Sequence, residues 1–241
     1  MPSFVVVIPA KDEEDFLPGL LASIKKQTVQ PIEIVLADAG STDATTRIAE
    51  AGGVRVVEGG LPGPGRNAGA QATKSDFIFF IDADIVLADP KFFEIAIADF
   101  ERRQLGVATF DLELDKGSPA QHFGHQVYNA YVRFWGGKNS HAMGGCILVR
   151  RWVHEAVKGF DPTVLFCEDN DYGKRANRVM KFGVINGVKI IVTNRRLARD
   201  GELTTVFKYM LAELHILFLG PIRHNWFKYE FGYTAKAEGK A

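Results

Sequence analysis

Residues 32–58 read IEIVLADAGSTDATTRIAEAGGVRVVE, and this stretch contains a strand, a helix and a second strand in close succession. The aliphatic, β-branched runs at 32–38 and 54–58 are typical of buried strands. Between them, residues 41–52 have a helical pattern, with Ser41 or Thr42 as the expected N-cap and Gly52 as the stop. Strands joined in this way pair in parallel through a right-handed crossover. The stretch therefore predicts an α/β fold.

The same alternation extends in both directions from this stretch. The pattern predicts further strands at 4–9, 76–82, 106–115, 145–151 and 187–193, and helices at 14–27, 63–74, 90–104, 119–135, 152–157, 168–180 and 203–219. No repeat or linker interrupts the chain, so we expect one domain over 1–241 with a mostly parallel central sheet flanked by helices. Its first half would cover residues 1–100, and its second half, 101–241, would end in an amphipathic helix.

The composition restricts the class of protein. The chain has 241 residues, 46% of them hydrophobic, and its 29 Lys and Arg balance 29 Asp and Glu, so no basic field indicates nucleic-acid binding. Two cysteines, Cys146 and Cys167, do not make a disulfide framework and favour a reduced, cytoplasmic protein. The N-terminus has no basic start and no apolar run reaches 18 residues, so we expect neither a signal peptide nor a membrane span.

Two aspartates end the apolar run FFIDADI at 79–85. A buried carboxylate is costly unless it is paired or binds a metal, and two carboxylates suit Mg²⁺ or Mn²⁺. Asp38 likewise ends a strand. Because ligands bind at the carboxyl ends of parallel strands, we expect Asp38, Asp82 and Asp84 on one edge of the sheet, beside the loop 9–14. The alternative for Asp82 and Asp84 is that they only cap the next helix or end the strand, whereas helix capping by Ser41 and Asp43 does not need Asp38.

Two further motifs carry charge next to predicted helices. GPGRNAGA at 63–70 contains Arg66, which would bind a phosphate or be a surface arginine; it is not a Walker loop. CEDNDYGKR at 167–175 places Glu168, Asp169 and Asp171 at a helix start. Acids there are favoured by the helix dipole, and a carboxylate is also a suitable general base for a hydroxyl.

Six motifs in order resemble those of family 2 glycosyltransferases: VIPAKDEE, ADAGSTDAT, GPGRNAGA, FFIDAD, MGGCILVRR and GFDPTVLFCEDNDYGKR. The resemblance covers residues 4 to about 180 and implies the GT-A fold. Two departures concern the nucleotide. Lys11 stands where the family commonly has an aromatic residue, and Ala37 and Ala39 leave Asp38 without an adjacent acid.

The resemblance implies an inverting transfer of a sugar from a nucleotide diphosphate, assisted by Mn²⁺ or Mg²⁺. Residues 1–100 would bind the nucleotide sugar, and 101–241 would face a saccharide or lipid-linked acceptor. The residues it implies are Pro9, Ala10, Glu14, Asp38, Arg66, Asp82 and Ala83 for the nucleotide, Asp82 and Asp84 for the metal, Asp169 with Glu168 for catalysis, and Gly144 and Gly145 on the donor-sugar or acceptor side. We add His141 as a further candidate, and Arg195 and Arg196 as ligands of the diphosphate or of an anionic acceptor; the alternative for these arginines is a solvated charge run.

The C-terminal part combines apolar residues at helical spacing (203–218) with GPIRHNWFKYEFGY at 220–233, which mixes aromatic and basic residues. Such a segment is typical of a membrane interface. The first interpretation is peripheral contact of 203–233 with the inner face of the membrane, close to a lipid-linked acceptor. The second is a helix that packs on the sheet or on a second subunit of a homodimer.

Two other functions remain as alternatives. A sugar-phosphate nucleotidyltransferase would have a glycine-rich, basic loop after its first strand, whereas PAKDEEDF at 9–16 is acidic. A nucleotide-sugar-binding scaffold without turnover would be expected to lack a carboxylate at 84 or 169, and both are present.

Overall fold

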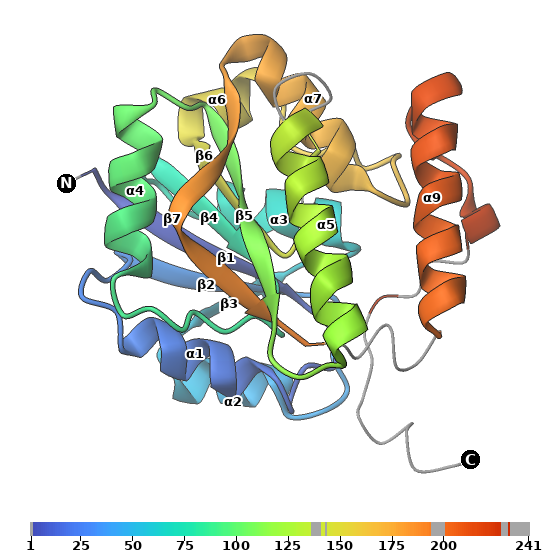
Figure 1. The fold of residues 1–241 in the computed structure, drawn as a ribbon. Helices are drawn as coiled ribbons and strands as arrows, with labels where there is room; N and C mark the ends of the chain where they lie inside the picture. The colour runs from blue at the N-terminus through green and yellow to red at the C-terminus, as the bar shows by residue number, and fades with distance from the viewer. Residues whose placement is uncertain (1, 136–140, 143, 194–200, 228–230, 232–241) are drawn as a thin grey trace.

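The computed structural model describes residues 2–135, 141–142, 144–193, 201–227 and 231. Its centre is one mixed sheet in the order β3-β2-β1-β4-β6-β5-β7 (Figure 1). The strands are β1 (Phe4–Ala10), β2 (Glu33–Asp38), β3 (Arg55–Glu58), β4 (Phe77–Ile81), β5 (Val107–Leu114), β6 (Cys146–Arg150) and β7 (Phe182–Val192).

Strands β1 to β4 pair in parallel, as the alternating pattern predicts. Strand β6 is antiparallel to both β4 and β5, and β5 and β7 pair in parallel. With this single exception, the strands run in one direction. The predicted α/β class with a mostly parallel sheet flanked by helices is therefore confirmed.

Helices cover both faces of the sheet. They are α1 (Leu17–Lys25), α2 (Thr45–Ala51), α3 (Pro62–Gln71), α4 (Phe92–Arg102), α5 (Pro119–Trp135), α6 (Arg151–Ala156), α7 (Glu168–Val179) and α9 (Glu202–Phe218), followed by the 3₁₀ helix η1 (Asn225–Phe227). Alternate residues of β1 point to opposite faces. Val6 joins the cluster that contains side chains of α1, α2 and α4, and Val7 joins the cluster with α3, α6 and α7.

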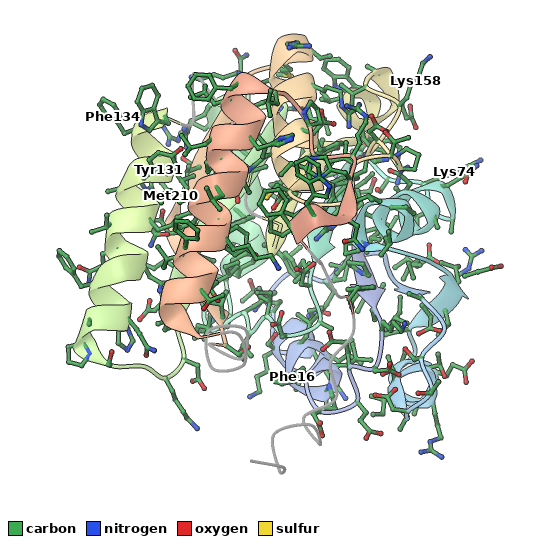
Figure 2. All side chains as sticks on the ribbon, turned by 90° about the vertical axis from the view of Figure 1, so that its right-hand side faces the viewer. Phe16, Lys74, Tyr131, Phe134, Lys158 and Met210 are labelled. Atoms are coloured by element: carbon green, nitrogen blue, oxygen red, sulfur yellow. The ribbon has the colours of Figure 1, made fainter. Side chains whose placement is uncertain are left out.

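Helix α9 stands at one side of the molecule (Figure 1). It packs through a small separate cluster in which Phe166, Ala212 and Ile222 are buried. Figure 2 shows α5 next to α9, with Tyr131 and Met210 labelled at the boundary between the two helices. None of the helices in the described part of the chain is long and apolar enough to cross a bilayer.

Several predicted boundaries are wrong for local reasons. Strand β7 begins at Phe182, five residues before the expected start. Gly187, with φ +90°, and a register shift opposite Thr109 and Asp111 interrupt the apolar pattern that would have indicated it. Helix α2 begins at Thr45, without a side-chain N-cap from Ser41.

Candidate active site

The sheet topology brings separate motifs to one edge. Parallel pairing sets Ala10 beside Asp38, so β1 and β2 end together, and β4 ends at the same edge. Because β6 is antiparallel to β4, its first residue, Cys146, pairs with Ile81 at that edge. The segment that precedes β6, with Gly144 and Gly145, is thereby brought next to the aspartates that follow β4.

Close packing of α3 on β1 positions Arg66. A Cβ atom built on Gly69 would lie 2.3 Å from Cγ1 of Val7, and one on Gly65 would lie 3.6 Å from Cβ of Pro9. Glycine at 69 lets the helix approach the strand this closely, whereas a side chain at 65 would make only an ordinary contact. Arg66 thus lies within the helix and at the end of β1, with its side chain only 2% exposed. The interpretation of Arg66 as a surface arginine is wrong.

The guanidinium of Arg66 is the centre of the site. Nη1 donates to Oε1 of Glu168 at 2.7 Å, and Nη2 donates to Oδ1 of Asp82 at 2.8 Å and to the carbonyl oxygen of Gly144 at 3.0 Å. Burial acts to lower the pKa of Arg66, but the charges of Asp82, Glu168 and Asp169 outweigh it and raise that pKa. The guanidinium of Arg66 therefore connects α3 with the end of β4, the segment before β6 and the start of α7.

Asp169 lies in the first turn of α7. Burial raises its pKa to about 7, and the neighbouring charge of Glu168 acts in the same direction, while Arg66 and His141 lower it. Its Oδ1 accepts a hydrogen bond from its neighbour's backbone N–H, that of Asn170, at 2.9 Å. A carboxyl group with a pKa near the working pH is suited to take and release a proton.

A polar cluster connects Asp169 to α5 and α9. Nδ1 of His141 lies 3.0 Å from Oε1 of Glu213 on α9, and its Nε2 lies 2.9 Å from the hydroxyl of Tyr128 on α5. Nδ2 of Asn170, next to Asp169 in α7, donates to the same Glu213 oxygen at 3.2 Å. His141 was predicted from the sequence as a candidate site residue, whereas Tyr128 and Glu213 were not. The available signal for Glu213 was an acid that interrupts an apolar helical pattern.

Asp82 and Asp84 flank the buried Ala83. Burial raises the pKa of Asp82 against the effect of Arg66, and the charge of Asp84 raises it further. Oδ2 of Asp84 accepts from the hydroxyl of Thr193 at 3.4 Å, just after β7. Among the described residues no three His, Cys, Asp or Glu side chains form a metal-binding group. Two carboxylates nevertheless fit Mg²⁺ or Mn²⁺ sites, in which one or two carboxylates act together with substrate phosphates.

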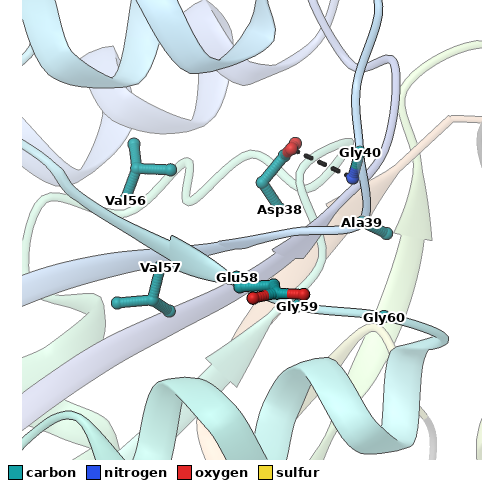
Figure 3. A pocket seen from close by; sticks show the side chains of 8 residues that line it. All are labelled: Asp38, Ala39, Gly40, Val56, Val57, Glu58, Gly59 and Gly60. Carbon is teal, nitrogen blue, oxygen red and sulfur yellow. Dashed lines mark hydrogen bonds between the residues drawn. The ribbon is translucent and has the colours of Figure 1, made fainter.

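A separate cleft lies at the ends of β2 and β3. Asp38 and Glu58 contribute to a cleft of about 530 Å³, shown in Figure 3. The carboxylate of Asp38 accepts hydrogen bonds from the backbone N–H groups of Gly40 and Ser41, both at 3.0 Å, and from the Ser41 hydroxyl at 2.5 Å. The carboxylate of Asp38 therefore organises the turn that follows β2.

The remaining predicted residues are placed as follows. Pro9 and Ala10 are buried at the end of β1. Glu14 accepts from the backbone N–H of Ala44 at 3.0 Å and so holds the start of α2. The carbonyl oxygen of Gly145 accepts from the N–H of Asp82 at 3.0 Å. Arg195 and Arg196 lie outside the described residues. The structure therefore brings Arg66, Asp82, Gly144, Glu168 and Asp169 together, and Asp38 lines a separate cleft.

We expect Gly144→Ala to disturb this site. The added Cβ would lie 2.8 Å from Oδ2 of Asp169 and 3.4 Å from Nη2 of Arg66, so the carboxylate must move. A shift of about 1 Å costs on the order of 10²-fold in turnover. The matched control is Gly124→Ala on α5, where an added Cβ meets nothing within 4 Å. Wild-type kcat in Gly144→Ala would show that Asp169 does not need its present position.

Comparisons with known proteins agree with the motifs. The model of the family described as glycosyl transferase family 2 matches residues 5–158. The 4,4'-diaponeurosporenoate glycosyltransferase of Staphylococcus haemolyticus is 33% identical over 111 residues, which are 42% of this chain and 29% of that protein. Glucosyl-3-phosphoglycerate synthase of Mycolicibacterium paratuberculosis is 36% identical over 98 residues, 36% of this chain and 30% of that protein. The matched part of the chain thus spans about three tenths of these curated relatives.

Solved structures share the fold. S. aureus TarS in complex with UDP superposes with a TM-score of 0.65 at 20% identity, over 90% of this chain and 72% of that chain. The mannosyltransferase PcManGT from Pyrobaculum calidifontis, in complex with GDP-Man and Mn²⁺, has a TM-score of 0.62 at 16% identity, over 80% and 56% of the two chains. Glucosyl-3-phosphoglycerate synthase from Mycobacterium tuberculosis, in complex with Mn²⁺, UDP and phosphoglyceric acid, has a TM-score of 0.60 at 20% identity, over 88% and 78%.

Proposed function

The chain belongs to glycosyl transferase family 2, and we propose that it transfers a sugar from a nucleotide-diphosphate donor to an acceptor hydroxyl or phosphate, with inversion at the anomeric carbon. The observation that carries this proposal is the position of Asp169. Its carboxyl group, with a pKa raised to about 7, lies against Gly144 beside the Arg66–Asp82 pair, at the edge where the parallel strands end. Ligands of such sheets bind at that edge.

Asp169 is the general base in this proposal. The acceptor hydroxyl loses its proton to Oδ2 of Asp169, the acceptor oxygen forms a bond to the anomeric carbon, and the bond from that carbon to the diphosphate oxygen breaks. Oδ1 stays bonded to the N–H of Asn170 and fixes the carboxylate plane. Glu168 takes a positioning role, because its hydrogen bond to Arg66 holds the start of α7 against the site.

Arg66 has two tasks. It compensates the charges of Asp82 and Glu168, and it lowers the pKa of Asp169, so that the base is ionised at a lower pH than burial alone would allow. Its nitrogen atoms are engaged by these carboxylates and by the carbonyl oxygen of Gly144. Within the proposal Arg66 therefore organises the site, and any contact with a phosphate follows a rearrangement of these bonds.

We assign Asp84 and Asp82 as the residues that hold a divalent cation. Oδ1 of Asp82 bonds to Arg66, and its Oδ2 accepts no hydrogen bond from the described residues. When bound, the cation stabilises the negative charge that builds on the leaving diphosphate. The solved relatives with Mn²⁺, UDP or GDP-Man support a divalent cation and a UDP- or GDP-sugar as donor. We place the nucleobase of the donor in the cleft at Asp38 and Glu58.

The protein would act in the cytoplasm as one domain, with residues 1–100 on the donor side and 101–241 on the acceptor side. Neither Cys146 nor Cys167 forms a disulfide, which suits a reducing compartment. The sheet runs without a break from β1–β4 of the first half to β5–β7 of the second, and this supports a single domain.

Thermal shift with UDP- and GDP-sugars tests the donor and the metal. A ligand at a hundredfold excess over its Kd stabilises the folded state by about 2.7 kcal/mol, roughly 5–10 °C for a domain of this size. We expect such a shift with one class of donor in the presence of Mn²⁺. Asp84→Asn should abolish the part of the thermal shift that depends on Mn²⁺. The control, Glu155→Gln, replaces an exposed acid on α6 and should leave the shift unchanged.

Two results would count against this assignment. A shift that persists unchanged in Asp84→Asn removes Asp84 from the metal site. The absence of a shift with every nucleotide sugar, with or without Mn²⁺, contradicts the proposed donor.

A further inference from the structure

The outward side of α9 is apolar. Seven of its residues are exposed by 40–76%: Val206, Phe207, Met210, Leu211, Leu214, Leu217 and Phe218. At 100° per residue they occupy one continuous arc of the helix. Two charged residues flank this arc and turn to the protein: Lys208 packs over the ring of Phe166, and Glu213 bonds His141. A surface helix of a globular protein normally has the opposite arrangement.

The neighbouring helix α5 has a similar stripe. Phe123, Val127, Ala130 and Phe134 recur at helical spacing and are all exposed, Phe123 by 65% and Phe134 by 79%. The guanidinium of Arg133 turns back to Asp111 on β5. Both helices contact His141, through Tyr128 and Glu213, so the two stripes belong to adjacent elements, as Figure 2 shows. We call these eleven residues of α5 and α9 the α5–α9 surface.

Single exposed apolar residues need no explanation, but neighbouring stripes on two helices mark an interaction site. The eleven side chains of the α5–α9 surface carry no hydrogen-bonding group, and the exposed Thr204 and Gln126 lie at its margin. Protein–protein interfaces usually combine an apolar core with a polar rim and about ten hydrogen bonds. The acyl region of a lipid layer, which has no hydrogen-bonding groups, matches such a surface better.

Two exposed tryptophans beside the surface and the composition of the C-terminal sequence agree with a lipid partner. Trp135 ends α5 and is 38% exposed, and Trp226 follows α9 and is 82% exposed; tryptophan is enriched at membrane–water interfaces. The chain has no net charge, yet residues 195–241 hold eight Lys and Arg against five Asp and Glu. Basic segments are attracted to anionic lipids. With 17 residues, α9 is about 25 Å long and suits a position in the plane of the interface.

We propose that the α5–α9 surface binds the surface of an anionic lipid bilayer. Its apolar side chains enter the boundary between headgroups and acyl chains, and the polar side of α9 stays on the protein. Because Glu213 and Tyr128 reach His141 from the same two helices, the bilayer would lie next to the polar cluster that extends to Asn170, the neighbour of the proposed base. This orientation suits an acceptor in the membrane and rests on the proposed function, whereas the docking itself does not.

Co-sedimentation of the full chain with vesicles tests the docking. We expect binding to vesicles of phosphatidylcholine mixed with phosphatidylglycerol, and weaker binding to phosphatidylcholine alone. The variant Phe207→Glu with Leu214→Glu should lose at least about ten-fold in vesicle partition, because both side chains leave the apolar phase. The matched control, Ile32→Glu with Trp152→Glu, changes two exposed apolar residues elsewhere and should bind as the wild type does.

A second copy of the chain could cover the same surface in place of a bilayer. Light scattering after size-exclusion chromatography tests this by measuring the oligomeric state. A wild-type dimer that the α9 variant dissociates, without vesicle binding, overturns the proposal. Three other results also overturn it: equal binding of the wild type to both kinds of vesicle, an equal loss of vesicle binding in the control variant, and no binding of the wild type to either kind of vesicle. An unchanged circular dichroism spectrum and melting temperature establish that the α9 variant is folded. No arm uses nucleotide or metal, so the outcome is separate from that of the donor test.

Discussion

Asp169→Asn is expected to bind the nucleotide-sugar donor normally and to lose turnover by about 10²–10⁴-fold, which is the usual contribution of a general base. An amide keeps the shape of the side chain but cannot accept the proton of the acceptor. The measurement is kcat for the variant beside a donor titration by thermal shift. The control is Asp171→Asn, an acid in the same turn of α7 that pairs with Arg175 at 2.7 Å; its turnover should stay close to wild type.

The pH dependence follows from the same residue. Since the pKa of Asp169 is raised to about 7 and the base must be ionised, wild-type kcat should rise with pH through about 7. The loss of this ionisation in Asp169→Asn should leave a residual rate without that step. Wild-type turnover in the variant, or a wild-type profile that is flat between pH 5 and 9, would remove Asp169 from the role of base.

Stability should change in the opposite direction to activity. In the folded state Asp169 binds its proton more tightly than in the unfolded state. The protonated group therefore contributes fully to the free energy of unfolding below about pH 4, and this contribution is lost as pH rises to about 7. Asparagine does not ionise and loses no stability over this interval. The stability advantage of Asp169→Asn should therefore grow over this interval, with an upper bound of about 4 kcal/mol from roughly three pKa units. Urea denaturation at several pH values measures it.

Arg66→Met is expected to be the most destabilising single change in the site. It removes the guanidinium and leaves Glu168, which is 13% exposed, and Asp82, which is 36% exposed, without their partner; breaking a buried pair costs about 3–5 kcal/mol, and the solvation of Asp82 sets the expected loss toward the lower end. The control is Arg55→Met, whose side chain is 54% exposed and lies 3.4 Å from Glu33. An exposed pair of this kind contributes less than about 1 kcal/mol.

Thermal and urea denaturation compare the two arginine variants. Arg66→Lys should restore part of the stability, because an ammonium keeps the charge but cannot donate in the fork geometry that joins Glu168, Asp82 and Gly144. In Arg66→Met the pKa of Asp169 should move upward, since the charge of Arg66 lowers it. If Arg66→Met were no more destabilising than Arg55→Met, the site would not depend on this cation.

Sequence patterns predicted most elements because their signals are local. The runs FVVVIP and FIFFI form β1 and β4 within a residue or two of the expected bounds. The boundaries of β7 and α2 were wrong where local hydrogen bonds and a positive φ at Gly187 outweighed the apolar periodicity. The roles of the candidate residues were implied by the resemblance to a family, and they stay predictions until the variants above are measured.

The sequence by itself determined the order of strands and helices and the acidic residues at the strand ends. These features can be recognised because the apolar periods of 2 for strands and 3.6 for helices involve only neighbouring residues. From these patterns follow the α/β class, the shared edge for Asp38 and Asp82, and the acidic start of α7. Only the tertiary structure decided that Arg66 is buried rather than exposed, and that it pairs with Glu168, 102 positions away in the chain. Likewise, Tyr128 and Glu213 meet at His141 because α5 and α9 dock there. The physical reason is that burial and long-range pairing depend on how distant elements pack, which no local pattern contains.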